Sequence, residues 1–96
     1  MPELRTLARI RSKNAGPFWL TIDLFCEAAT FDAVRAIPTG RFAERLRVNA
    51  TAIRRFDLLD LEVVKLSLPR PVVQGAFADR DMHGAGWAAA LARMEV

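Results

Sequence analysis

Polar and apolar residues alternate with a period of two in three stretches of this 96-residue chain: 4–11, 18–26 and 63–68. Successive side chains of a β-strand point to opposite faces of a sheet, so each stretch predicts a strand. In the second stretch Leu20, Ile22 and Leu24 fall on one face. In the third, Val64 and Leu66 face the expected core, which places Lys65 on the opposite face.

A turn separates the first two predicted strands. The run 14–17 reads Asn-Ala-Gly-Pro, which combines residues that tolerate positive φ with one that cannot donate to a strand ladder. We therefore expect an N-terminal hairpin with the cationic stretch Arg11-Ser12-Lys13-Asn14 leading into its tip.

Helices are predicted between and after the strands. Thr30 suits an N-cap for a short helix over 31–37 that Pro38 ends, and Thr39 suits the cap of another that runs to Arg47. Stretch 51–56 is ambiguous. The tail has Trp87, Leu91 and Met94 at helical spacing, although a short final strand competes with a helix there. These elements together predict an α+β fold: a small two-layer domain whose antiparallel sheet packs against two or three short helices.

Composition supports one domain over residues 1–96, because 52% of the residues are hydrophobic and a chain of this length builds one core. Such a core is modest, so burial of apolar surface against a partner is useful, and we expect a homo-oligomer by default. The single cysteine, Cys26, excludes an internal disulfide and a multi-cysteine metal site, and it fits a reducing cytoplasm. No apolar run is long enough to span a membrane, and we expect no export.

The net charge is +3, with fourteen basic residues interleaved with eleven acidic ones along the chain. A nucleic-acid module more often clusters its basic residues and carries a recognisable motif, so we do not expect nucleic-acid binding. Most of these charges are read as solvated surface groups.

The stretch 11–14 is the main candidate site. A guanidinium from Arg11 and an ammonium from Lys13 suit a carboxylate or phosphate, and Ser12 and Asn14 add neutral hydrogen-bonding groups. The alternative is that Asn-Ala-Gly-Pro is only a good turn whose basic neighbours are solvated.

Two later basic residues are candidates for the same anion. Lys65 is a second anchor, or an amine of lowered pKa, or an ordinary strand lysine at the surface. Arg70 stands between two prolines that restrict its backbone, although a strand end bounded by prolines needs no function.

Asp79, Asp81 and His83 alternate, so an extended backbone would place all three on one side. That spacing suits proton transfer by His83 with a carboxylate, whereas a loop with ion pairs to basic neighbours is the alternative. Arg80 between the aspartates argues against a metal, and we assign none.

Three separated blocks resemble an uncharacterised bacterial family, a domain of unknown function. The blocks are Arg-Ser-Lys-Asn-Ala-Gly-Pro-Phe at 11–18 followed by Leu-Thr-Ile-Asp, the Lys65 strand running into Pro-Arg-Pro at 69–71, and Asp-Arg-Asp-Met-His-Gly-Ala at 79–85. The family usually has glutamine next, where this chain has Gly86. Its members stand beside, or are fused to, proteins similar to the acyclic-terpene-utilisation protein AtuA, in settings of acyl-CoA and organic-acid catabolism.

The resemblance implies an accessory subunit or domain of an AtuA-like protein. On this hypothesis Arg11, Lys13 and Asn14 orient an organic acid or an acyl-CoA phosphate, with Lys65 and Arg70 in support. The alternative is an independent small enzyme that acts on an organic acid with His83 and Asp81 or Asp79. The sequence leaves open whether the chain is an enzyme, and it assigns no cofactor.

Overall fold

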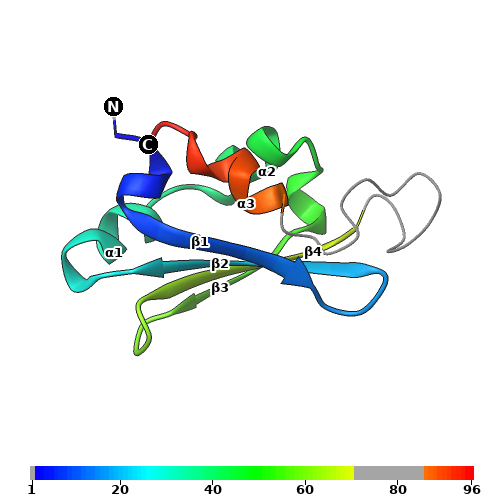
Figure 1. Ribbon diagram of the computed structural model, residues 1–96, viewed down its shortest axis with the longest axis horizontal. Coiled ribbons are helices and arrows are strands. Elements are labelled where there is room, and N and C mark those ends of the chain that lie inside the picture. Colours follow the sequence, from blue (N-terminus) through cyan, green and yellow to red (C-terminus); the bar gives the residue numbers. More distant parts are fainter. Residues whose placement is uncertain (1, 71–85) are drawn as a thin grey trace.

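A computed structural model describes residues 2–70 and 86–96 of the chain. Within them, antiparallel strands form one sheet in the order β1-β2-β4-β3, and the α-helices lie against one face of it (Figure 1). The predicted α+β fold with an N-terminal hairpin is confirmed. The strands are β1 (Ala8–Asn14), β2 (Trp19–Cys26), β3 (Arg54–Leu58) and β4 (Val63–Pro69).

The β1–β2 hairpin closes as its turn residues predict. The Ala15 amide donates to the Trp19 carbonyl at 2.9 Å, and Gly16 adopts a φ of +81°, a conformation that a residue without a Cβ reaches at little cost. The turn is therefore closed by a backbone hydrogen bond of its own.

The first strand begins later than the alternation predicts. Leu4–Thr6 forms a short 3-10 helix, η1, rather than the start of β1. The Leu4 amide donates to the Met94 carbonyl at 2.8 Å and the Val96 amide donates to the Pro2 carbonyl at 3.0 Å, so this segment pairs with the other end of the chain. Tertiary contact with the C-terminus overrides the local period of two, and the two ends lie side by side (Figure 1).

The helices begin slightly away from the predicted caps. Glu27 caps the first helix, and Thr30 is its third residue, where the Thr30 hydroxyl accepts from the Glu27 amide at 3.2 Å in a capping box. Pro38 precedes the second helix, so Thr39 is its first residue and not its cap. The α-helices are α1 (Ala28–Arg35), α2 (Thr39–Leu46) and α3 (Gly86–Ala92), and a 3-10 helix, η2 (Ala50–Ala52), precedes β3.

The core lies between the sheet and the α-helices. Alternate residues of β2 and β4 supply one side of it and the apolar stripes of α1, α2 and α3 the other, as the predicted faces require. The side chains with no exposed surface include Leu4, Leu20, Ile22, Leu24, Val34, Phe42, Val64, Leu66, Leu68 and Leu91.

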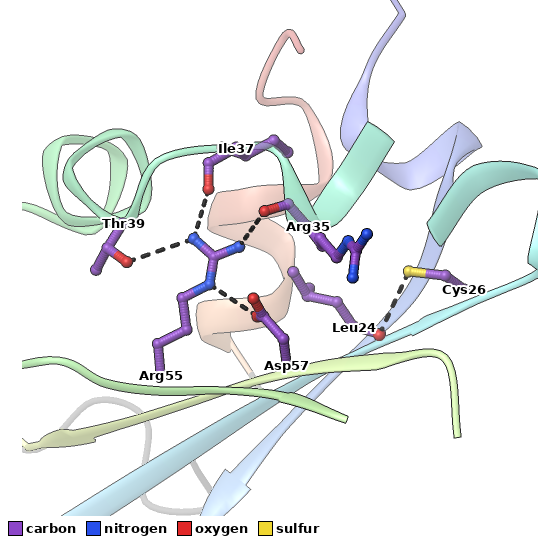
Figure 2. A network of polar contacts seen from close by, with 7 residues as sticks. All are labelled: Leu24, Cys26, Arg35, Ile37, Thr39, Arg55 and Asp57. Atoms are coloured by element: carbon purple, nitrogen blue, oxygen red, sulfur yellow. Dashed lines mark hydrogen bonds and ion pairs between the residues drawn. The ribbon is translucent and has the colours of Figure 1, made fainter. Parts of the chain in front are cut away.

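One arginine joins β3 to the helical layer (Figure 2). The Arg55 side chain is only 14% exposed, and its guanidinium donates to the carbonyls of Ile37 and Arg35, the latter at 2.7 Å. It also donates to the Thr39 hydroxyl at 3.3 Å and forms an ion pair with Asp57 at 3.0 Å. Because Arg35 is the last residue of α1 and Ile37 follows it, Arg55 binds carbonyls that the end of the helix leaves without an intrahelical partner.

Candidate anion-binding surface

The α-helices leave one face of the sheet uncovered (Figure 1), and the strand register places most of the polar strand residues on that face. We call it the open face. It is defined by Arg9, Arg11 and Lys13 of β1, Trp19, Thr21, Asp23 and Phe25 of β2, Arg54, Phe56 and Leu58 of β3, and Val63, Lys65 and Ser67 of β4.

The strand register sorts these residues into rows that cross all four strands. The charged row runs Arg11, Asp23, Lys65, Phe56 from β1 to β3. Residues directly opposite each other in antiparallel strands have Cβ atoms about 4.5–5.5 Å apart, so the Asp23 carboxylate lies between two cations.

The neighbouring hydroxyl row runs Lys13, Thr21, Ser67, Arg54. Two hydroxyls in the middle of the sheet are thus bracketed by a cation on each edge strand. The rows are two residues apart along each strand, a spacing of about 7 Å.

Thr21 is the most unusual residue of this surface. It is 8% exposed, and its Oγ1 atom has no hydrogen-bond partner among the described residues. A buried hydroxyl without a partner costs about 1–3 kcal/mol, so most such groups in folded proteins are bonded. The Thr21 side chain belongs to the open face by its register, but its Oγ1 atom has almost no solvent-exposed surface.

The cations of the open face form no ion pair within the described chain. The ion pairs there join Arg5 to Glu3, Arg35 to Asp32 and Arg55 to Asp57, none of which lies on the open face. Five basic side chains therefore share this surface with one acidic side chain, Asp23. Such a surface carries a positive potential that attracts anions.

Aromatic rings fix two of these cations. The Arg9 guanidinium stacks 4.7 Å from the centre of the Phe25 ring, and Arg54 lies 5.2 Å from the Trp19 ring. These cation–π contacts hold the guanidinium groups against the sheet and leave the charge in place.

The structure divides the predicted anion site into two groups. Arg11, Lys13 and Lys65 lie on the open face, whereas Ser12 and Asn14 point to the opposite face of β1. The Ser12 hydroxyl, 7% exposed, accepts from the Ala88 amide at 3.0 Å and so joins β1 to α3.

Asn14 belongs with Arg70 in the second group. The Arg70 guanidinium donates to the Asn14 side-chain oxygen, and the Arg70 amide donates to the Phe18 carbonyl at 2.8 Å. This contact braces the hairpin against the end of β4. The proposed proton-transfer residues Asp79, Asp81 and His83 lie outside the described residues.

A second cluster of arginines, near the C-terminus, forms hydrogen bonds within the fold. A depression of about 480 Å³ between α2 and the C-terminal segment is lined by Arg41, Arg45 and Arg93. Arg41 donates to the Glu95 carbonyl and Arg45 to the Ala90 carbonyl, the latter at 2.8 Å. Both guanidinium groups thus secure the end of the chain to α2.

A family model for a domain of unknown function, DUF4387, matches residues 4–95. The chain belongs to this family. No curated protein and no solved structure matches it.

The residues that match the DUF4387 model include all four strands and both rows of the open face. Within the described part of this DUF4387 chain, no helix is long and apolar enough to cross a bilayer. The same part contains no group of three metal-ligating side chains.

Sequence reasoning missed three residues of the candidate site in this DUF4387 chain: Thr21, Ser67 and Arg54. The alternation in 18–26 places Thr21 and Asp23 on the face opposite the core, which was a usable signal. Alternation does not give the register between strands. Only the pairing of β2 with β4 and of β4 with β3 brings these residues into one row with Lys13.

Cys26 is not part of this surface. Its thiol donates to the Leu24 carbonyl at 3.6 Å (Figure 2). Burial, with a smaller contribution from the Glu62 carboxylate, raises the pKa of the Cys26 thiol. The thiol is therefore held in its less reactive protonated form at neutral pH.

Proposed function

We propose that this chain is a small accessory subunit that binds a carboxylate or phosphate group on the open face of its sheet. The observation that carries the proposal is the hydroxyl row, where the unpartnered Thr21 hydroxyl lies between Lys13 and Ser67. Lys13 supplies a compact positive charge and the Ser67 hydroxyl a neutral donor, and a shift of the side chains that cover Thr21 would open its buried hydroxyl to the anion.

Charge favours one position for the anion. The Asp23 carboxylate repels an anion placed over the charged row, so the anion belongs over the hydroxyl row. Arg11 and Lys65 then border the site from the neighbouring row, and their long side chains reach toward it.

The resemblance found in the sequence supplies the setting. We propose that the partner is an AtuA-like protein and that the anion belongs to an organic acid or an acyl-CoA phosphate. A reducing cytoplasm, consistent with the single Cys26, is the proposed compartment. In this arrangement the chain holds the acidic group while the larger protein contributes the reacting atoms.

A titration with phosphate and citrate, followed by amide chemical shifts or heat, tests the site. We expect Arg11→Gln/Lys13→Gln to weaken binding at least tenfold, because charge-assisted hydrogen bonds are each worth about 1.5–3 kcal/mol. The matched control is Arg5→Gln/Arg93→Gln, which removes the same charge from exposed residues off the open face. Equal loss in both variants would mean that only net charge matters.

The same titration locates the anion relative to Asp23. Asp23→Asn removes the repulsion across about 7 Å, and we expect anion binding to tighten about threefold to tenfold. Weaker binding in this variant would place the anion elsewhere.

Co-elution of the chain with an AtuA-like protein tests the partnership separately. We expect one complex that elutes earlier than either protein. If the proteins elute apart while the chain still binds phosphate, the anion site stands and the partner is wrong.

A second candidate is single-stranded nucleic acid, favoured by the aromatic rings among the cations. Phe56 is 50% exposed in the charged row, and Trp19 and Phe25 lie on the same face. Basic residues that are scattered in the sequence are gathered by folding onto one surface, and bases stack on such rings. A labelled oligonucleotide would bind with an affinity that falls steeply with salt, whereas a small-anion site would leave it unbound at physiological salt.

A further inference from the structure

The outer edge of β3 carries a second interaction surface, which borders the open face because Arg54 and Phe56 belong to both. Among the strands that the structure describes, in the order β1-β2-β4-β3, β3 pairs with β4 on one side and with no strand on the other. An edge strand presents unpaired backbone N–H and C=O groups that accept a further strand.

Exposed apolar side chains concentrate at this edge. Phe56 of β3 is 50% exposed, and Leu59 and Leu61 in the turn that follows are 59% and 68% exposed. The remaining large hydrophobic residue with comparable exposure in the described chain is Phe18, 60% exposed in the β1–β2 hairpin loop. An apolar group this exposed beside an open strand edge is typical of a protein–protein contact.

The sequence of β3 is complementary to itself. It reads Arg54-Arg55-Phe56-Asp57-Leu58, and antiparallel pairing about a two-fold axis at Phe56 sets Arg55 opposite Asp57 of a second copy. The same register sets Phe56 against its own equivalent and Arg54 against Leu58. Paired aromatic residues are favourable directly across strands. Arg55 and Asp57 already form an ion pair within one chain at 3.0 Å, and in this register the second copy adds a carboxylate opposite Arg55 and a guanidinium opposite Asp57 without breaking that pair.

The other edge of the sheet lacks this property. Antiparallel self-pairing of β1 about its middle residue sets Arg11 against Arg11 and Arg9 against Lys13, all of like charge. Like charges directly opposite one another destabilise a strand pair, so β1 disfavours a second copy.

We propose that β3 pairs with β3 of a second copy of this chain and joins the two sheets into one of eight strands. The symmetry is that of an isologous two-fold contact, in which the same surface is used by both copies. The charged row becomes continuous across the axis, with the Phe56 pair between the two Lys65 residues. Because five residue pairs and a few apolar side chains make a small interface, we expect a Kd between about 1 µM and about 1 mM.

Sedimentation equilibrium of the full chain across that concentration range measures the association. We expect a reversible dimer in the wild type and a monomer in Phe56→Lys, which sets like charges against each other at the axis. Phe18→Lys is the matched control, since it changes an equally exposed phenylalanine away from β3 and should leave the dimer intact.

Cross-linking tests the register without relying on a charged variant. Opposed residues of antiparallel strands have Cα atoms about 4.5–5.5 Å apart, within the range a disulfide spans. In a Cys26→Ala background, Phe56→Cys should form a covalent dimer under mild oxidation, and Phe18→Cys should stay monomeric. A chain that is monomeric throughout, or a dimer that Phe56→Lys leaves unchanged and Phe56→Cys does not cross-link, overturns the proposal.

Discussion

Thr21 shows how one buried hydroxyl connects stability to binding. Its Oγ1 atom has no partner in the described chain, although the residue is 8% exposed in the middle strand pair of the sheet. Valine has nearly the same shape and higher β-propensity, so folding alone would favour it here. A threonine kept at a cost to stability fits a surface that receives a ligand.

Thr21→Val should therefore separate the two properties. We expect the free energy of unfolding to rise by about 1 kcal/mol, because the variant no longer buries an unsatisfied hydroxyl. Anion affinity should fall severalfold, since a donor in the hydroxyl row is lost. Urea unfolding and phosphate titration of the same preparation measure both quantities, and a variant that loses stability while keeping its affinity would contradict this account.

At the scale of elements, β3 depends on one side chain more than on its own sequence. Arg55 joins it to the carbonyl groups after α1 and to Thr39 at the start of α2, which explains how an ambiguous segment becomes a strand. Alternation correctly predicted β2 and β4, whose apolar faces are buried. It was wrong for Leu4–Thr6 and silent on β3, because contacts distant in the sequence decide both.

Arg55→Lys tests this role of the guanidinium. Lysine keeps the positive charge but cannot donate to acceptors in three directions from a planar fork. We expect a loss of about 2 kcal/mol in the free energy of unfolding, measured by urea denaturation. Arg54→Lys is the neighbouring control on the open face and should change stability by less than about 0.5 kcal/mol.

In the candidate site, too, the local sequence pattern predicts some features and contacts between distant residues decide the others. Residue types and alternation predicted that Arg11, Lys13 and Lys65 are solvent-facing cations. Alternation also places Ser12 and Asn14 on the other face of β1, but it could not predict that they bind Ala88 and Arg70, since those partners are more than fifty residues distant. Residues adjacent in a strand alternate between faces, so a run of polar residues in a strand divides between two surfaces.

Across the whole molecule, the cations gathered on one side of the sheet repel one another. Five basic residues share the open face with Asp23 and form no ion pair in the described chain, so their mutual repulsion opposes folding. Screening by salt weakens that repulsion, and a bound anion removes more of it.

Phosphate should accordingly stabilise the fold beyond its effect on ionic strength. We expect the melting temperature to rise in sodium chloride and to rise several degrees further in phosphate at matched ionic strength. Differential scanning calorimetry measures both shifts. In Arg11→Gln/Lys13→Gln the phosphate increment should vanish, and an unchanged increment would assign the effect to another surface.

The hydrogen bond between Val96 and Pro2 has a practical consequence for attaching this protein to a surface. Because Pro2 and Val96 are hydrogen-bonded neighbours in the helical layer, a tag, surface linker or fused domain attached to either end leaves from the same spot. That spot faces away from the cationic side of the sheet. Immobilised molecules would therefore present the open face outward whichever end carries the attachment.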